Sequence, residues 1–486
     1  MILLMTVIVE PERKTPVAAS VDVVVTGGGP AGLVAALAAK RAGADTLLIE
    51  RHGYLGGLLT GGFVTKPQAP VVGGIPEEVF ERARRLRGAR GNVRYRLRDG
   101  SYTYFMSPID PEMMKRVAFE MVEEAGVKLL LHSLVVGSVT EGSKVKGVIV
   151  ENKSGRQAIL SNVVVDASGD ADVAAWAGAP YEVGRREDGI AQPMSMMFRM
   201  GNVDVNKLVE YARNNPEDFT FTYYPDVKGP VPEQDQRLNI VLEGFWKLQK
   251  KAAEEIGYER PRMGLNVKTG IGIGDVFINA TRITEGVATN VQDLTSAEIR
   301  VRKQVQECVD FLVKYVPGFE KAYLMDTPAE IGVRESRRIV GEYTLTLDDI
   351  LKRRKFEDVV AKGYGVIDIH EPGGRGLRFE AIEEYQIPYR CLVPKKVDRL
   401  LVAGRCISCD HEALGTVRTI PTCMYTGQAA GAAAALSAKL QTMPRDLNVS
   451  ELQKTLMEQN AVISGSVLST LLLRFERDSR VGEEVA

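Results

Sequence analysis

Three glycines at a fixed spacing are the first chemical signal in this chain of 486 residues. Gly27, Gly29 and Gly32 follow the β-branched run 21–26, which predicts a buried parallel strand, and Leu33 begins a predicted helix. In this arrangement the first glycine makes a tight turn, the second lets the backbone approach a pyrophosphate, and the third lets the helix pack on the strand. We therefore expect a dinucleotide site here; the alternative is a glycine-rich turn without a ligand.

An acidic residue lies where such a site needs one. Glu50 ends the next predicted strand, 23 positions after Gly27, where its carboxylate can bind a ribose 2′-hydroxyl. Gly56 and Gly57 follow, and glycine, which has no Cβ, lets the backbone approach the same dinucleotide a second time.

The far end of the chain favours FAD over NAD as the dinucleotide. Residues 400–405 form another apolar strand ending in a glycine, and an Ala/Gly-rich helix is predicted at 422–440. A cofactor bound by both ends of a chain is typical of flavoproteins, and no second G-x-G-x-x-G indicates a separate NAD(P)H domain. We expect FAD to be bound without a covalent bond; the alternative is attachment through His52 or a cysteine. The residues expected to bind it are Gly27, Gly29, Pro30, Ala31, Gly32, Glu50, Arg51, Gly56, Gly57, Val135, Ser168, Gly169, Gly404, Arg405, Arg418 and Thr422.

The predicted C-terminal helix offers positive potential to the flavin. Pro421 suits the first turn of this helix, and the backbone N–H groups at such an end carry about half a positive charge. They can stabilise the negative charge of a reduced flavin. The alternative is a packing helix that begins with a proline.

The chain resembles the FAD-dependent oxidoreductase family related to the fumarate reductase and glutathione reductase flavoproteins. The resemblance extends over roughly residues 21–440 and implies a bound FAD and a redox activity, but it does not specify a substrate. The segments that carry it are 21–32, 164–172, 188–193, 279–282, 331–338, 368–370 and 403–408.

Two of the four histidines are candidate acids or bases for such a reaction. His370 ends the predicted strand 366–370 before a glycine-containing loop, and the family resemblance supports a catalytic role for it. His411 follows the turn expected to contact the cofactor and is the second candidate. For both, the alternative is a structural histidine, which is the role expected of His52 and His132.

Arginines could hold a carboxylate or a developing oxyanion of the substrate. Arg334 and Arg390 are the candidates. If the segment around Arg334 is helical, the spacing places it on one face with Arg337 or Arg338. The alternative is that these arginines bridge domains through acidic neighbours.

The cysteines offer a different redox chemistry. Cys406 and Cys409 have the C-x-x-C spacing of a redox disulfide, although the chain's five cysteines are too sparse for a disulfide scaffold. With four histidines and no paired Cys/His clusters, we expect no metal site.

Composition limits the partners and the compartment. The net charge is −1, from 62 basic and 63 acidic residues, so neither nucleic acid nor a membrane is an expected partner. The first ten residues lack a basic n-region, and we expect a leading strand and a cytoplasmic protein. A small-molecule substrate is expected, whereas the electron acceptor and a homo-oligomeric state stay open.

The periodicities predict an α/β fold in which an FAD-binding Rossmann-like domain carries an inserted α+β substrate domain. A helix is expected at 110–125, a strand at 127–132 and a meander from 145–150 and 158–165. The predicted division is 1–180 and 396–445 for the FAD-binding domain, 181–395 for the substrate or cap domain, and 446–486 for a C-terminal helical tail whose last residues are mobile.

These patterns favour one function and leave two alternatives. The favoured function is an FAD-dependent oxidoreductase that transfers a hydride between the flavin and a small polar metabolite, such as a hydroxy compound, a sugar derivative or a carboxylic acid. One alternative is a thiol-disulfide reductase that uses Cys406 and Cys409. The other is a non-redox role for FAD, in an isomerase, a hydratase or a subunit of a complex.

Overall fold

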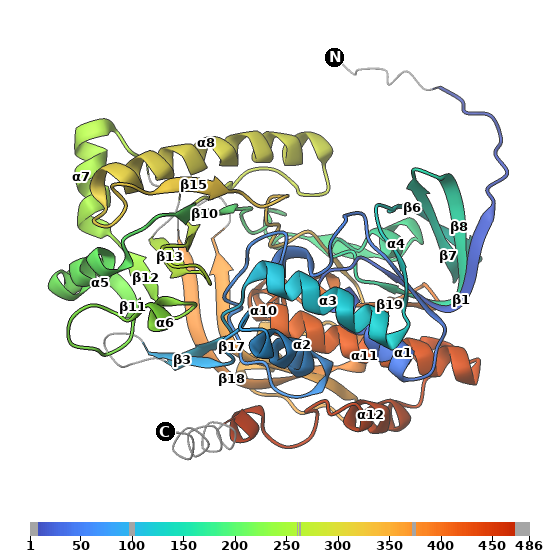
Figure 1. Ribbon diagram of the computed structural model, residues 1–486. Coiled ribbons are helices and arrows are strands. Elements are labelled where there is room, and N and C mark those ends of the chain that lie inside the picture. The colour runs from blue at the N-terminus through green and yellow to red at the C-terminus, as the bar shows by residue number, and fades with distance from the viewer. Residues whose placement is uncertain (1–7, 97–102, 260, 262–263, 372–375, 472–486) are drawn as a thin grey trace.

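The two ends of the chain form one unit and its middle forms another (Figure 1). The computed structural model describes residues 8–96, 103–259, 261, 264–371 and 376–471. In Figure 1 the blue, teal and orange-red segments build the nucleotide-binding unit, and the green to yellow segments that include β10 to β15 build a cap beside it. Among the described residues, no helix combines the length and apolar character needed to cross a membrane.

A seven-stranded sheet is the centre of the nucleotide-binding unit. Its order is β5-β2-β1-β8-β7-β6, and β19 pairs with the carboxyl-terminal end of β8. The strands β5, β2, β1, β8 and β19 are parallel, so their carboxyl ends lie along one edge, while β6, β7 and β8 form an antiparallel meander. The bounds are β1 Val17–Thr26, β2 Thr46–Ile49, β5 Lys128–Leu130, β6 Leu134–Glu141, β7 Lys144–Asn152, β8 Gly155–Asp166 and β19 Leu400–Val402.

This sheet confirms the predicted α/β class and most of its predicted strands. The run 21–26 is the buried half of β1, as its β-branched residues indicated. The pattern analysis missed β6, because most of its residues are only half-buried and their hydrophobic signal is weak. The leading strand expected over the first ten residues is not seen where the structure describes them, since β1 begins at Val17 and residues 1–7 lie outside the described part.

Helices cover this sheet at positions close to those predicted. α3 begins after Asp110, whose side chain accepts a hydrogen bond from the Met113 N–H, and it ends at Gly126, which has a φ of 67°. The helices of this unit are α1 Pro30–Arg41, α2 Gly74–Arg85, α3 Pro111–Ala125, α4 Asp172–Trp176, α9 Leu347–Leu351, α10 His411–Val417, α11 Ile420–Leu440 and α12 Val449–Glu458.

The contact between α1 and α11 is the most extensive between any two elements of the described structure that are not paired strands. It depends on two glycines of α11. A Cβ on Gly427 would overlap the carbonyl oxygen of Ala31, and a Cβ on Gly431 would overlap that of Ala35. The two helix backbones therefore touch directly, and this contact joins the first βα element to the C-terminal helix.

The cap has its own six-stranded sheet and its own hydrophobic core. The strand order is β11-β12-β13-β14-β10-β15, with antiparallel pairing throughout. The core cluster runs from Met194 to Ile331 and includes the inner face of the long helix α8. The bounds are β10 Met197–Gly201, α5 Val205–Asn214, β11 Phe219–Tyr223, α6 Glu233–Gln236, β12 Val241–Gly244, α7 Trp246–Ile256, β13 Leu265–Thr269, β14 Val276–Asn279, α8 Val291–Tyr315 and β15 Tyr323–Asp326.

Residues 340–395 were expected in the substrate or cap domain, but most of their buried apolar side chains pack in the core of the nucleotide-binding unit. The hairpin of β17 (Val359–His370) and β18 (Leu377–Pro388) packs on α10 and α11, and its buried Tyr385 and Ile387 belong to the core of the nucleotide-binding unit. The core boundary therefore falls near Ile331 rather than at 395, because the hairpin buries its apolar side chains against α11. The tail is also integrated through α12, while residues 472–486, expected to be mobile, lie outside the described residues.

The segment after Arg334 is extended rather than helical. Strand β16 (Arg337–Ile339) pairs with β9 (Tyr181–Val183), so the helical face proposed for Arg334 with Arg337 or Arg338 is wrong. The remaining hairpin is formed by β3 (Val93–Arg96) and β4 (Thr103–Met106).

We expect Gly431→Ala to destabilise the protein by about 1–3 kcal/mol, because the new methyl group must push α11 away from the Ala35 carbonyl. Gly137→Ala in β6 is the matched control, since its Cβ would meet Ile149 at an ordinary 3.9 Å. Thermal melts of both variants beside the wild type test this. Equal melting temperatures for the two variants would contradict the close helix contact.

Candidate functional site

A cleft opens at the carboxyl ends of β2, β1, β8 and β19. Its wall is formed by the turns that follow these strands, at Glu50, Gly27, Ser168 and Gly404. The cleft contains about 1200 Å³ that protein atoms do not fill, part of it open to solvent. Ligands of open α/β sheets bind at this edge, so the cleft is the candidate cofactor site.

Two glycines of the first turn have different physical roles. A Cβ on Gly32 would overlap the carbonyl oxygen of Gly27, so this position needs glycine for the fold itself. Gly29 lines the cleft, has an ordinary φ of −67°, and nothing lies within 4 Å of where its Cβ would be. Its missing side chain leaves space for a ligand at the N-terminus of α1.

Glu50 is held in place by backbone donors and still faces the cleft. One carboxylate oxygen accepts from the Gly28 N–H at 2.6 Å and the other from the His52 N–H at 2.8 Å. The residue is buried and lines the cleft. Each carboxylate oxygen can accept a second hydrogen bond, so the orientation suits a ribose hydroxyl.

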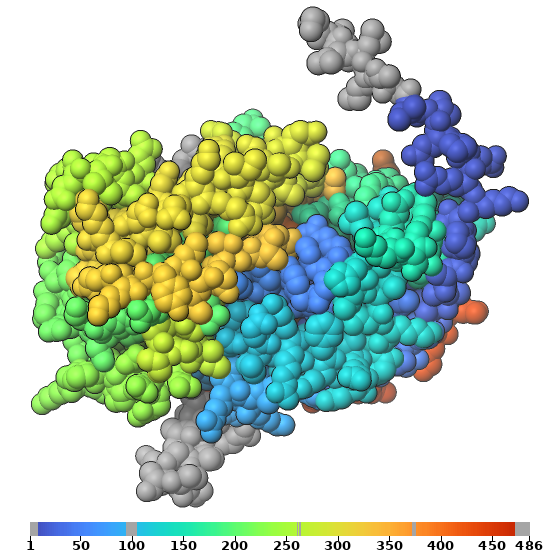
Figure 2. Space-filling model, turned by 45° about the horizontal axis from the view of Figure 1, so that its top comes forward, coloured from blue at the N-terminus to red at the C-terminus, as the bar shows by residue number. Residues whose placement is uncertain are grey.

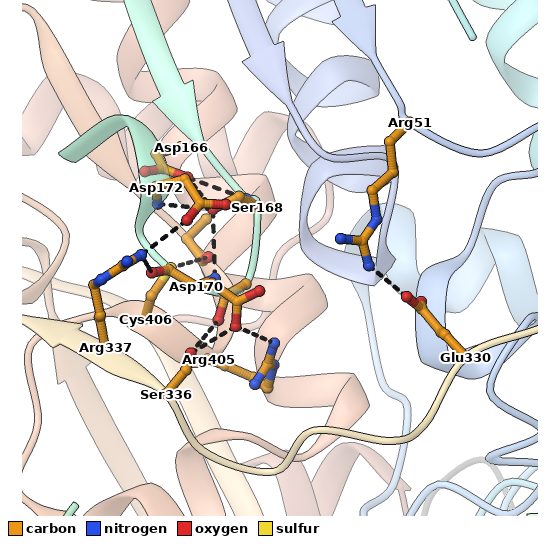
Figure 3. A network of polar contacts seen from close by, with 12 residues as sticks. Arg51, Asp166, Ser168, Asp170, Asp172, Glu330, Ser336, Arg337, Arg405 and Cys406 are labelled. Carbon is orange, nitrogen blue, oxygen red and sulfur yellow. Dashed lines mark hydrogen bonds and ion pairs between the residues drawn. The ribbon is translucent and has the colours of Figure 1, made fainter. Parts of the chain in front are cut away.

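A buried carboxylate organises the turn after β8 (Figure 3). Asp166 is fully buried and accepts hydrogen bonds from the Ser168 N–H at 3.1 Å, the Ser168 hydroxyl at 2.7 Å and the Ala174 N–H at 2.9 Å. Burial raises the pKa of Asp166 to about 6, although these donors oppose the shift. The carboxylate thereby fixes the turn that presents Ser168 and Gly169 to the cleft.

Polar and charged side chains connect the same turn to the segment that follows β19 and to the region of β16. Asp170 pairs with Arg405 at 3.0 Å and accepts from the Ser336 hydroxyl at 2.6 Å, and Asp172 pairs with Arg337 at 2.8 Å (Figure 3). Arg405 lines the cleft, and its buried Nη1 has no hydrogen-bond partner. An unpaired guanidinium nitrogen on this wall fits an anionic ligand such as a pyrophosphate.

Most of the residues expected to bind the cofactor line this one cleft. They are Gly27, Gly29, Pro30, Ala31, Glu50, Arg51, Gly57, Val135, Ser168, Gly169, Gly404, Arg405 and Arg418. Three others do not line it: Gly32 packs on Gly27, Gly56 donates its N–H to the Gly28 carbonyl, and the buried hydroxyl of Thr422 bonds to that of Thr419. These three residues would affect a ligand only indirectly, through the shape of the backbone segments that line the cleft.

Arg51 joins the cofactor wall to the cap. It forms an ion pair with Glu330, and the His52 ring lies 3.3 Å from the same carboxylate. Burial alone would raise the pKa of Glu330, but the hydrogen bond to His52 and the charge of Arg51 outweigh it and lower the pKa. Figure 2 shows the orange segment that follows α8 lying directly against the blue segment of the nucleotide-binding unit. The sequence contained no local signal for this pair, which is 279 positions apart.

A second group of polar side chains adjoins the cleft through Arg418. The Asp368 cluster consists of Gln192, Arg282, Asp368, His370 and Arg418, from the cap loops, β17 and the residue after α10. Arg418 donates to the Asp368 carbonyl at 2.6 Å and lies 3.3 Å from its carboxylate. Burial alone would raise the pKa of Asp368, but the contacts with His370 and Arg418 hold it well below its ordinary value.

Both ring nitrogens of His370 are engaged within this cluster. Its Nδ1 lies 2.6 Å from Nη2 of Arg282, and its Nε2 lies 3.2 Å from the Asp368 carboxylate. The predicted position of His370 at the end of a strand is confirmed. Arg282 was not singled out as a candidate, although it lies in the motif 279–282, because nothing local indicates a partner 88 positions away.

The other predicted catalytic residues lie in three different settings. Arg334 is in the loop before β16 and donates to the Pro193 carbonyl at 2.6 Å. His411 is buried, and its Nδ1 lies 2.9 Å from Glu335, a fully buried carboxylate that also pairs with Arg338. None of the four predicted catalytic residues is among those that line the cleft. His370 is connected to it through Asp368 and Arg418, whereas Arg390 is half exposed and pairs with Asp358 at 2.9 Å, so the expected role of Arg390 at the reacting centre finds no geometric support.

The C-x-x-C cysteines are in an environment that opposes thiol chemistry. Cys406 and Cys409 are both buried and free. Burial raises the pKa of both thiols well above the ordinary value. Since the thiolate is the reactive form, neither cysteine is prepared for exchange with a disulfide. The described residues also contain no cluster of three or more His, Cys, Asp or Glu side chains suited to a metal ion.

Comparisons with known proteins show what this chain is similar to. A family model for the FAD dependent oxidoreductases matches residues 22–456. The thiamine thiazole synthase of Methanococcus vannielii is 27% identical over 247 residues, covering 49% of this chain and 87% of that protein. The same enzyme of Methanococcus aeolicus is 31% identical over 163 residues, covering 32% and 57%. A solved structure, a geranylgeranyl bacteriochlorophyll reductase-like protein of Thermoplasma acidophilum, has a TM-score of 0.46 at 15% identity and covers 91% of this chain and 84% of that one.

The two glycines should separate ligand binding from folding. We expect Gly29→Ala to melt like the wild type without cofactor but to bind FAD at least about tenfold more weakly, a change of about 1.4 kcal/mol. Gly32→Ala should instead lower the melting temperature of the cofactor-free protein, because its methyl group overlaps the Gly27 carbonyl. Titration of the apoproteins with FAD and thermal melts check both outcomes. Unchanged FAD affinity in Gly29→Ala would place the pyrophosphate elsewhere.

Asp166 should contribute to stability in a pH-dependent way. Its folded pKa of about 6 lies above the unfolded value, so its contribution is fully present below about pH 4 and is lost as the pH rises through about 6. Asp166→Asn cannot ionise and lacks this dependence. The difference in unfolding free energy between the two proteins should therefore change by about 3 kcal/mol between about pH 4 and pH 7.5. Denaturant titrations at both pH values test this, and a constant difference would refute it.

Proposed function

Because this chain belongs to the FAD dependent oxidoreductase family, we propose that it transfers a hydride between FAD and a small polar metabolite, such as a hydroxy compound, a sugar derivative or a carboxylic acid. When bound, FAD supplies the group that accepts or donates the hydride. The narrower resemblance to the fumarate reductase and glutathione reductase flavoproteins is part of this proposal, as is a location in the cytoplasm.

The cleft fits the cofactor from one end to the other. In the proposed arrangement Glu50 holds the adenosine ribose, Gly27 and Gly29 border the pyrophosphate, and Arg405 offers its unpaired Nη1 to an anionic oxygen. The N-terminal turn of α11 contributes Ile420 and Cys423 to the opposite wall. The backbone N–H groups of this turn would stabilise negative charge at the flavin end of the cleft.

The Asp368 cluster is the observation that carries the proposal. It brings two guanidinium groups and a histidine together, and one of them, Arg418, lines the cleft as Ile420 of the α11 turn does. Groups of this kind orient a polar substrate and hold or move its proton. In the proposed arrangement Arg334 extends this cluster from the cap side, and His411 is the alternative group for the proton.

Two other functions have less support. A thiol-disulfide reductase would need an accessible thiolate, and both Cys406 and Cys409 are buried with raised pKa values. A non-redox use of FAD would not need the flavin to change its redox state. An anaerobic screen of metabolites for bleaching of the oxidised flavin, or for recovery of absorbance by the reduced flavin, separates this use from the proposed function, because only a substrate that delivers or accepts a hydride changes the flavin absorbance.

We expect His370→Ala and Arg334→Ala to retain bound FAD and to lose turnover by about 10²–10⁴-fold with the metabolite that bleaches the flavin. Arg390→Ala is the control, because this arginine pairs with Asp358 outside the cleft and its loss should leave turnover unchanged. Flavin absorbance and steady-state rates measure both properties. Normal turnover in both test variants would place the reaction elsewhere in the molecule.

A further inference from the structure

We infer that the substrate carries an anionic oxygen group, a carboxylate in its simplest form, which binds to the Gln192 amide and to the guanidinium groups of Arg282 and Arg418. This inference rests on the proposed function and specifies its substrate class. It also gives His370 the role of a positioning residue for Arg282.

The first argument is an unpaired buried donor with a fixed orientation. Gln192 is only 2% exposed, and its Oε1 accepts from the His370 N–H and from Arg418, both at 3.4 Å. The amide cannot be reversed, because reversal would turn its NH₂ toward two other donors. Its Nε2 has no partner in the described structure. A buried donor of this kind requires an acceptor, which a bound ligand can supply.

The second argument is a guanidinium nitrogen that is also buried and without a hydrogen-bond partner. Arg418 bonds to Asp368 through Nη2, lines the cleft, and has a buried Nε without a partner. Gln192 bonds to Arg418, so two unpaired donors, one of them cationic, are held together in the Asp368 cluster, and Arg418 connects them to the cleft. A carboxylate offers two acceptor oxygens and a negative charge, which is the chemistry that matches both donors.

The third argument concerns the proton of His370. A guanidinium group stays protonated and can only donate, so Nδ1 of His370 must accept from Arg282. The ring proton is then on Nε2 and is donated to the Asp368 carboxylate. The neutral ring holds Arg282 in place without cancelling its charge. Because both nitrogens are used, His370 acts through Arg282, and of the two histidines of the proposed function His411 is left as the group for the proton.

The flavin itself also has carbonyl oxygens and could be the acceptor for the same donors. The experiment therefore uses FAD-loaded protein and measures carboxylate binding separately from FAD affinity. Acetate, glycolate and malonate are titrated at about pH 7.5, where they are ionised, with acetamide, glycolamide and malonamide as neutral counterparts. Calorimetry and the perturbation of the flavin absorbance report binding without turnover.

We expect saturable binding of the carboxylates and none of the amides. Gln192→Glu should weaken carboxylate binding at least about tenfold, because it places a carboxylate of the chain beside Arg418. Gln306→Glu makes the same change on the exposed face of α8 and should have no effect. Amides that bind as well as the acids, or unchanged carboxylate binding in Gln192→Glu, would overturn the inference.

The positioning role of His370 is tested by variants that keep or remove a hydrogen-bond acceptor at the position of Nδ1. His370→Asn keeps an acceptor near the position of Nδ1 and should retain carboxylate affinity within about threefold, whereas His370→Ala should lose about tenfold. His370→Asn should also keep the pH profile of turnover. Loss of that profile in the Asn variant, with carboxylate affinity intact, would make His370 a proton-transfer group and refute the positioning role.

The remaining outcomes separate this inference from the proposed function. If Gln192→Glu weakens FAD binding and leaves carboxylate binding intact, the donors serve the flavin and the inference fails. Bleaching by a neutral metabolite, with no carboxylate binding, likewise refutes the inference and leaves the proposed function standing. Carboxylate binding without bleaching of the oxidised flavin, or reoxidation of the reduced flavin, by any metabolite supports the anion site and refutes the proposed function.

Discussion

The direct contact of helix backbones around α1 is the constraint on which the rest of the structure depends. Gly32 of α1 lies against the backbone of the first turn. Gly427 and Gly431 of α11 lie against the backbone of α1. Side chains at any of these positions would separate the elements, so the contact requires glycine. It places the start of α11 beside the carboxyl edge of the sheet, although the two helices are nearly four hundred residues apart in sequence. One continuous cleft results.

The two ends of that cleft have opposite electrostatic character. At one end, Glu50 is oriented by two backbone N–H groups and offers acceptor oxygens. At the other, Arg418 keeps an unpaired donor, and Gln192, which bonds to Arg418, keeps a second one behind it. Acceptors at one end suit ribose hydroxyls, and donors at the other suit oxygens that carry or develop negative charge. The polarity of the cleft therefore agrees with both the cofactor and the proposed chemistry.

The cap contributes to the site through contacts that cross between the two units. Arg282 lies in the cap and contacts His370 of β17, and Glu330 pairs with Arg51 of the nucleotide-binding unit. Strand β13 shows the consequence for sequence patterns: Asn266 and Lys268 alternate with apolar residues as if one face were solvated, yet all five residues are buried. The polar face of this strand is covered by other parts of the protein, and an alternating pattern does not reveal such a covering.

The sequence by itself determined the nucleotide-binding edge, because a glycine turn, the strand before it, the helix after it and Glu50 are local signals of backbone geometry. It also predicted α3 and α11 closely, since Pro111, Gly126 and Pro421 mark helix ends by short-range physics. Only the tertiary structure decided which charged side chains meet. Arg282 and Glu330 gain their partners through contacts 88 and 279 positions apart, and Arg390 is paired at the surface with Asp358. Such pairings depend on how packed units bring distant residues together, which no local pattern encodes.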